Sequence, residues 1–352
     1  MNPFLIVGGY GTVGTQTVKF LRQFRPDLPL ALAGRDVRKA QAAAHAIGNA
    51  VGVAVDTRRT DLGLPPGLKI SGIAVLTNDL STHPAKYAVR EGIPYTSIAT
   101  QLTHLAPKLA VQIGGRGRSA SLLQDTSFAG TLVLAALEVM RRFSSVDRIA
   151  IGAVMDEQDL GGPASQSDAE DFGDKAPGFL LAAGEWVQPD AGQGSRSFSL
   201  LDGTTYRGES FPSFDVPELA AKSDAPTIRL DFVLAETPGR RATGQPSVEI
   251  VYEITGMLAD GERAELKAQL SHAGGQTALT GIGVAVGIEA LLGLPGTGVV
   301  APGLYLPSTL IDPAHMVRRL EQAGARLRVQ TDGTRVQAIG EMPQPRRFSK
   351  AR

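Results

Sequence analysis

Residues 4–14 read FLIVGGYGTVG, and they decide how the rest of the chain is interpreted. The four apolar residues at 4–7 predict a short buried strand, and a glycine-rich turn follows directly. Residues 15–24 carry apolar side chains at helical spacing, and a second apolar run occupies residues 28–33. Strand, glycine turn, helix and strand form the setting in which Gly-x-Gly-x-x-Gly predicts a dinucleotide-binding site.

Each glycine of the motif has an expected physical role. Gly9 is expected to permit the tight turn, Gly11 to let the backbone approach a pyrophosphate, and Gly14 to let the helix pack closely on the sheet. The helix N-terminus would offer free N–H donors to the phosphates. The residues expected to bind the cofactor here are therefore Gly9, Tyr10, Gly11, Thr12, Val13 and Gly14. The alternative is a strand–turn–helix unit without a ligand.

The end of the second strand predicts which dinucleotide is bound. NAD-binding enzymes place an acidic residue there, which holds the ribose 2′-hydroxyl. This chain has Gly34-Arg35, followed by Lys39 one helical turn later, and a guanidinium suits a 2′-phosphate. Asp36 is expected to cap the next helix as well as to border the site. The sequence favours NADP(H) over NAD, the alternative being that Arg35 is an ordinary surface arginine.

The same alternation of strand and helix continues to residue 143. Expected strands lie at residues 50–55, 70–76, 94–98 and 120–123, and expected helices at 37–47, 84–91, 102–113 and 128–143. This alternation predicts a Rossmann-type doubly wound parallel sheet, whose ligand crevice lies at the carboxyl ends of the strands. By that rule Asp79, Thr100 and Asp125 are expected to lie near one another.

Further site residues follow from the same rule. Asp56 and Thr57, after the third strand, are placed to meet an adenine, and Thr77 and Asn78 follow the fourth strand. Asp79 and His83, in the same loop, are the expected catalytic residues, since both side chains can transfer a proton near neutral pH. A turn carboxylate and a surface histidine are the alternatives.

After residue 146 the pattern changes to strands with few helices between them, at residues 149–154, 186–187, 196–201, 227–235, 247–257 and 262–270. Hairpin turns are expected at Asp202-Gly203 and Asp260-Gly261. This predicts a second α+β domain on a mainly antiparallel sheet. The polar loop 156–178 is expected to cover the site.

The expected units are a dinucleotide-binding domain (1–145), an α+β substrate or dimerisation domain (146–272), C-terminal helices and a hairpin packing back on the first domain (273–343), and a basic tail (344–352).

Composition narrows the class of protein. The 35 basic residues balance the 35 acidic ones, which argues against a nucleic-acid partner. There is no cysteine, so disulfides and thiolate chemistry are excluded. The apolar stretch 273–294 contains glycines, Gln276 and Glu289, and is expected to be a buried helix and not a membrane span. A strand at residue 4 leaves no room for a signal peptide, so we expect a soluble cytoplasmic protein. No metal site is expected, because the histidines and carboxylates lack ligand spacing.

The chain resembles the saccharopine dehydrogenase-like family of NADP-binding oxidoreductases. The resemblance rests on residues 6–14 with 33–36, 75–98, 277–292 and 298–327. It implies a Rossmann domain carrying a middle α/β domain, with the last helices returning to the first. The chain departs from the family at residues 97–100, where an acidic residue is common, and at residues 125–130, where many members have Gly-x-Pro-Gly. Both places border the expected crevice, so the family's substrate does not carry over.

Two functions remain open. The first is an NADP(H)-dependent oxidoreductase, a homodimer transferring hydride to or from a small-molecule substrate, with a C–N bond as the candidate reacting bond. The second is a non-catalytic NADP-binding protein with a structural or sensing role. The fold alone cannot decide between them.

Overall fold

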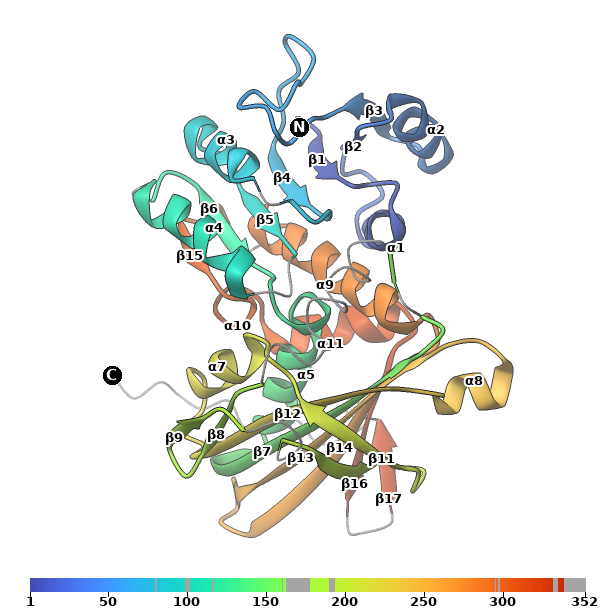
Figure 1. The fold of residues 1–352 in the computed structure, drawn as a ribbon, viewed down its shortest axis with the longest axis vertical. Coiled ribbons are helices and arrows are strands. Elements are labelled where there is room, and N and C mark those ends of the chain that lie inside the picture. Colours follow the sequence, from blue (N-terminus) through green and yellow to red (C-terminus); the bar gives the residue numbers. More distant parts are fainter. Residues whose placement is uncertain are drawn as a thin grey trace.

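The computed structural model describes residues 1–79, 81–98, 102–115, 117–159, 161–162, 178–189, 194–294, 296, 298–331 and 335–338. Two sheets face each other across a layer of helices (Figure 1). One buried apolar cluster extends from the first sheet through this layer to the inner face of the second sheet. The tail 344–352 and the hairpin turn at 332–333 lie outside the described residues.

The first sheet is parallel throughout. Its strands are β1 (Phe4–Val7), β2 (Leu30–Gly34), β3 (Ala50–Ala54), β4 (Gly72–Val75), β5 (Tyr95–Ser97), β6 (Ala120–Leu123) and β15 (Gly303–Tyr305). They lie in the order β15-β6-β5-β4-β1-β2-β3. The order reverses between β1 and β4, where a doubly wound sheet binds its ligand. The predicted Rossmann-type sheet is confirmed, and β15, which comes far later in the sequence, completes it.

Helices follow the first strands as the sequence predicted. They are α1 (Thr12–Phe24), α2 (Val37–Ile47), α3 (His83–Glu91) and α4 (Leu102–Gly114). The Asp36 carboxylate caps α2 by accepting hydrogen bonds from the backbone N–H groups of Arg38 (3.0 Å) and Lys39 (3.2 Å). Gly92 ends α3 in the left-handed conformation.

The helix expected at 128–143 is shorter than predicted. A 3-10 turn, η1 (Ser127–Gly130), precedes α5 (Thr131–Met140), and a strand begins at Phe143. Phe128 and Ala129 both have positive φ, 53° and 55°, which L side chains rarely adopt. Backbone strain is therefore held immediately after β6, at the carboxyl edge of the first sheet.

The second sheet is mixed, with antiparallel pairs predominating. Its strands are β7 (Phe143–Asp156), β8 (Leu180–Ala182), β9 (Glu185–Val187), β10 (Arg196–Ser199), β11 (Thr205–Ser210), β12 (Thr227–Ala235), β13 (Val248–Leu258), β14 (Arg263–His272), β16 (Arg326–Thr331) and β17 (Arg335–Ala338). β12 runs parallel to β7, and two short helices, α7 (Asp215–Ala220) and α8 (Pro238–Thr243), flank β12. The turns at Asp202-Gly203 and Asp260-Gly261 join β10 to β11 and β13 to β14, as expected. β16 pairs with β14, so the last hairpin extends this sheet, whereas the sequence had assigned it to the first domain.

Helix α9 (Gly275–Leu291) joins the two halves of the molecule, and α10 (Pro307–Leu310) and α11 (Pro313–Gln322) follow it. Figure 1 shows α9, α5 and α11 between the sheets. A Cβ at Gly281 would lie 2.6 Å from Cβ of Gln16 in α1, and one at Gly283 would lie 2.6 Å from the Phe128 carbonyl oxygen. The glycines of α9 thus allow α1 and the strained turn to approach closely. In the described part of the chain no helix is long and apolar enough to cross a membrane.

Candidate functional site

The glycine turn lies between β1 and α1 and has the geometry of a phosphate loop. Gly8 has a φ of +84° and so makes the left-handed turn after β1, and at Gly9, next in the turn, an added Cβ would lie 3.0 Å from the Ile6 carbonyl oxygen. A Cβ at Gly14 would lie 2.0 Å from the Gly8 carbonyl oxygen, which explains why only glycine allows α1 to pack on the turn. Among the described residues, the neighbour of a Cβ added at Gly11 is the same oxygen, at 3.2 Å. Gly11 itself is exposed.

The first turn of α1 is available to an anion. Gly11 is the N-cap, no described side chain caps the helix, and its first turn contains no acidic residue. Gly11 and Thr12 are both exposed. Free N–H groups at a helix N-terminus together with an open glycine turn fit a dinucleotide pyrophosphate. The residues present are therefore compatible with the expected cofactor.

Tyr10 links the glycine turn to the end of β2. Its hydroxyl accepts a hydrogen bond from the Asp36 backbone N–H (3.1 Å). Its ring covers Gly34 so closely that a Cβ there would lie 2.3 Å from the hydroxyl oxygen. Arg35 is exposed beside it, and no hydrogen bond or ion pair joins the Arg35 side chain to another described residue. The Asp36 carboxylate is bonded to the N-terminus of α2, and the exposed basic side chains at this strand end are Arg35, Arg38 and Lys39.

The loops after β3 and β4 are joined to each other. Ser81 donates from its hydroxyl to the Thr57 carbonyl (2.7 Å), and its N–H and hydroxyl both approach the Asp79 carboxylate at 3.2 Å. The Asp56 carboxylate accepts from Arg58, a hydrogen bond that lowers the pKa of Asp56. Thr77 and Asn78 are exposed, at the carboxyl end of β4.

His83 forms the first residue of α3. Its Nδ1 is buried and has no hydrogen-bond partner among the described residues. Its backbone N–H approaches Ser81 Oγ at 3.4 Å. Asp79 thus lies in the loop after β4 and His83 at the start of α3, and their catalytic roles stay predictions.

A second polar group at the sheet edge was missed by sequence reasoning. Lys108 of α4 is buried, with its Nζ 3.1 Å from Ser97 Oγ and 3.5 Å from Asp125 Oδ1. The Tyr95 hydroxyl is buried with Ser97, and burial, together with the nearby carboxylates of Asp125 and Asp79, raises the pKa of Tyr95. That Asp79 and Asp125 lie near one another stays a prediction, and Thr100 lies outside the described residues. A search for Ser-x-x-x-Lys or Tyr-x-x-x-Lys could not find Lys108, because it follows Ser97 by eleven residues.

Helix α7 brings two buried carboxylates to the same edge of the first sheet. Asp215 accepts from the N–H (2.9 Å) and hydroxyl (2.8 Å) of Ser127, and Glu218 accepts from the N–H of Ser308 (2.7 Å). Ser127 follows β6, and Ser308 follows β15, its neighbour in the sheet. Burial raises the pKa of Asp215, and it raises that of Glu218 to about 7. Two carboxylates from the second half of the chain thus bind the segments that follow β6 and β15 in the first sheet.

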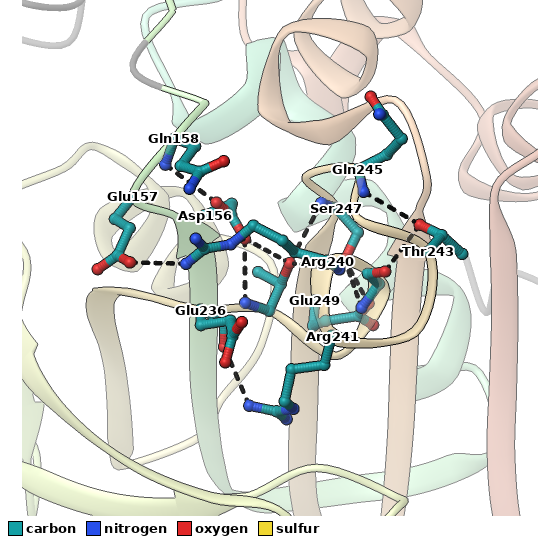
Figure 2. Close-up of polar contacts among 12 residues, drawn as sticks. Asp156, Glu157, Gln158, Glu236, Arg240, Arg241, Thr243, Gln245, Ser247 and Glu249 are labelled. Atoms are coloured by element: carbon teal, nitrogen blue, oxygen red, sulfur yellow. Dashed lines mark hydrogen bonds and ion pairs between the residues drawn. The ribbon is translucent and has the colours of Figure 1, made fainter.

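The loop predicted to cover the site is described only at its two ends. Figure 2 shows where it begins: Arg240 donates to Asp156 (3.0 Å) and to Glu157 (2.6 Å) at the end of β7. A few residues later the Asp159 carboxylate accepts from the N–H of Gln276 at the start of α9 (2.7 Å). A Cβ at Gly162 would lie 3.0 Å from Thr12 Oγ1. The described start of this loop therefore reaches the N-terminus of α1, beside the glycine turn.

Within the described ranges, no group of three or more His, Asp or Glu side chains could hold a metal ion. At the sheet edge Ser81 is hydrogen-bonded to Asp79, Lys108 to Ser97 and Ser127 to Asp215.

Comparison with solved structures places this arrangement among known folds. Apo saccharopine dehydrogenase (L-Glu forming) from Saccharomyces cerevisiae superposes with a TM-score of 0.67, covering 94% of this chain and 100% of that one, at 12% sequence identity. The chain has a saccharopine dehydrogenase-like fold. At this identity the similarity concerns the fold and not the activity.

Other solved structures are less similar to this chain, and comparison with curated sequences finds no match. A myo-inositol dehydrogenase from Corynebacterium glutamicum matches over 92% of this chain and 95% of that one (TM-score 0.43, 14% identity), and a dihydrodipicolinate reductase from Paenisporosarcina over 87% and 97% (TM-score 0.41, 12% identity). No protein-family model matches the sequence, and no curated protein matches it.

Proposed function

We propose that this chain is an NADP(H)-dependent oxidoreductase that acts on a small molecule. The observation that carries the proposal is the open, uncapped glycine turn beside an exposed Arg35, with Tyr10 bridging the two. A bound dinucleotide would lie with its pyrophosphate at residues 9–14 and its 2′-phosphate at Arg35 and Lys39. Asp56 and Thr57 would border the adenine, and Thr77 and Asn78 the nicotinamide half.

The chain's own residues would orient the reactants and handle the proton, while the cofactor, when bound, supplies the hydride. Asp79 and His83 are the proposed proton-transferring groups, and the C–N bond of an imine or amine is the proposed reacting bond. A homodimer, a cytoplasmic location and the lack of a nucleic-acid partner are further parts of this proposal, the last supported by the balanced charge.

Calorimetry with NADPH and NADH tests the proposal first. Wild-type protein is expected to bind NADPH more tightly than NADH. Gly11→Val is expected to abolish binding of both while the protein stays folded, because the new side chain occupies the pyrophosphate position. Gly48→Val is the matched control, since nothing lies within 4 Å of its added Cβ, although its positive φ will lower stability. Unchanged NADPH affinity in folded Gly11→Val would place the nucleotide elsewhere.

A screen for turnover then separates the two candidate functions. NADPH oxidation would be followed with 2-keto acids and amines in combination. Tight NADPH binding without oxidation of any pair would favour the second candidate, a nucleotide-binding protein with a structural or sensing role. That candidate is supported by the departures from the family pattern at residues 97–100 and 125–130.

A further inference from the structure

The chain that leaves β7 runs from the second sheet to the N-terminus of α1. We call its described residues, 156–159 and 161–162, the bridging segment. It begins at Asp156, whose buried carboxylate accepts from the N–H (3.0 Å) and the hydroxyl (2.7 Å) of Thr237. At its other end a Cβ on Gly162 would lie 3.0 Å from Thr12 Oγ1, so Gly162 lies against the first residue of α1. A piece of the second half of the chain thus adjoins the glycine turn.

Asp159 fixes the bridging segment to the start of α9. Its carboxylate accepts from the backbone N–H of Gln276 (2.7 Å), and the Gln276 side-chain amide donates to the Asp159 carbonyl. The backbone N–H of Gly161 faces the same carboxylate. Gly275 has a φ of +70°, and a Cβ there would lie 2.0 Å from Asp159 Oδ2, so a glycine at this position lets the carboxylate reach the helix. Asp159 therefore serves α9 as a cap from a distant part of the chain, since the helix has no side-chain cap at its own N-cap residue.

The bridging segment borders the glycine turn without filling it. Gly11 and Thr12 remain exposed although Gly162 lies against Thr12. A pyrophosphate bound at the first turn of α1 would therefore have the bridging segment at its side. Because Asp159 and Gly162 belong to one short segment, the contact that Asp159 makes with α9 determines where Gly162 stands beside Thr12.

We propose that Asp159 is a positioning residue, which holds the bridging segment in place as one wall of the pyrophosphate site and thereby raises the affinity for the dinucleotide. This inference rests on the proposed function. A wall that is ordered before the ligand arrives removes an ordering cost from the free energy of binding. Without the Asp159 contact, binding itself must order the segment, and the affinity falls. NADPH and NADH share the pyrophosphate, so both should lose affinity equally, whereas Arg35 is expected to distinguish them.

The test is calorimetry on the full-length chain with three ligands: NADPH, NADH and adenosine 2′-phosphate, which lacks the pyrophosphate. Asp159→Ala should raise the dissociation constants of NADPH and NADH by the same factor, about three- to tenfold, the range for losing a hydrogen bond that orders a segment. The dissociation constant of adenosine 2′-phosphate should not change. Gly162→Val should also weaken both dinucleotides, because its side chain would displace the segment from Thr12.

Three further variants separate positioning from a general loss of stability. Asp159→Asn keeps an acceptor for the Gln276 N–H and should bind both dinucleotides within about twofold of wild type. Gln276→Ala removes the other hydrogen bond of this contact, and combining it with Asp159→Ala should weaken binding little further, because both act through one contact. Asp260→Ala, at an exposed turn carboxylate that accepts from the Glu262 N–H (3.0 Å), should change no affinity. If Asp159→Ala does not fold, Gln276→Ala and Gly162→Val take its place.

The outcomes are distinct. Equal weakening of NADPH and NADH, with adenosine 2′-phosphate bound as before, supports the proposal. Unchanged dinucleotide affinities in the folded Asp159 and Gly162 variants overturn it and leave Asp159 as a cap of α9 alone, and so does an equal loss of affinity for adenosine 2′-phosphate. Failure of the wild-type protein to bind either dinucleotide overturns the proposed function instead.

Discussion

The Asp215 carboxylate accepts hydrogen bonds from both the backbone N–H and the hydroxyl of Ser127, at 2.9 and 2.8 Å. The two residues are 88 positions apart in sequence. Ser127 begins the turn in which Phe128 and Ala129 have positive φ. A helix that adjoins the second sheet therefore holds a strained turn at the carboxyl edge of the first sheet. A strained backbone conformation of this kind persists only where several contacts from the surrounding structure hold it in place.

Asp215→Ala tests this role in stability. The substitution leaves a buried N–H and a buried hydroxyl of Ser127 without their acceptor, and each such loss costs about 1–3 kcal/mol. We expect the free energy of unfolding, measured in urea, to fall by about 2–4 kcal/mol. Asp224→Ala, at an exposed position shortly after α7, should stay within about 0.5 kcal/mol of wild type. Equal losses in the two variants would contradict a specific role for Asp215.

Ala129→Gly tests the strain itself. Ala129 has a φ of 55°, where an L side chain costs about 1–2 kcal/mol and glycine does not. We therefore expect Ala129→Gly to raise the free energy of unfolding by up to about 1 kcal/mol. Ala135→Gly, in the regular part of α5, should lower it by about 1 kcal/mol or more. A melting temperature that falls in both variants would show that the turn is not strained.

Glu218 predicts how stability depends on pH. Burial raises its pKa from 4.5 to about 7 in the folded state, so the folded protein binds this proton more tightly than the unfolded chain does. The stabilising effect is complete below about pH 4.5 and is lost as the pH rises to about 7. The loss attributable to this group is at most about 3 kcal/mol.

Glu218→Gln should remove that part of the pH dependence, because an amide can still accept from the Ser308 N–H but does not titrate. Urea unfolding between pH 5 and 8 would show a flatter profile than wild type. Glu209→Gln, at an exposed position of β11, is the matched control and should retain the wild-type slope. Parallel profiles for wild type and Glu218→Gln would mean that Glu218 titrates normally.

Arg35→Ala tests the choice of cofactor. If Arg35 binds a 2′-phosphate, its loss should weaken NADPH binding by about 1–3 kcal/mol, the range for hydrogen bonds to charged groups. NADH, which lacks this phosphate, should bind almost as before. Arg118→Ala, at an exposed position after α4, should alter neither affinity. Equal weakening for NADPH and NADH would exclude Arg35 as the residue that distinguishes them.

Local patterns predicted the first half of the fold well. The apolar runs, the glycine motif and the capping Asp36 act over a few residues, and the observed β1, α1, β2 and α2 follow them closely. The sequence did not predict the turn at Phe128 and Ala129, because their apolar side chains continue a helical pattern. Contacts with Asp215 and with α9, distant in sequence, decide the conformation there.

The residues of the candidate site also fall into two groups, those that the sequence predicted and those that it did not. The glycine turn and Arg35 could be found because their spacing is local. The Lys108–Ser97–Asp125 group could not, since its members come from α4, β5 and the segment after β6, and only the parallel pairing of β5 with β6 brings them together. Likewise the roles of Asp215 and Glu218 depend on how α7 packs against the ends of β6 and β15. The spacing of residues along the sequence does not predict this packing.

The place of β15 has a consequence for how the chain is made. The ribosome synthesises residues 1–123, with six strands of the first sheet, long before residues 303–305 supply the seventh. Until then the outer edge of β6 has no partner strand, and α1 lacks its packing against α9. An amino-terminal fragment ending near residue 145 would expose both surfaces, and unpaired strand edges favour aggregation. The half built on the first sheet is therefore expected to fold stably only after nearly the whole chain has left the ribosome.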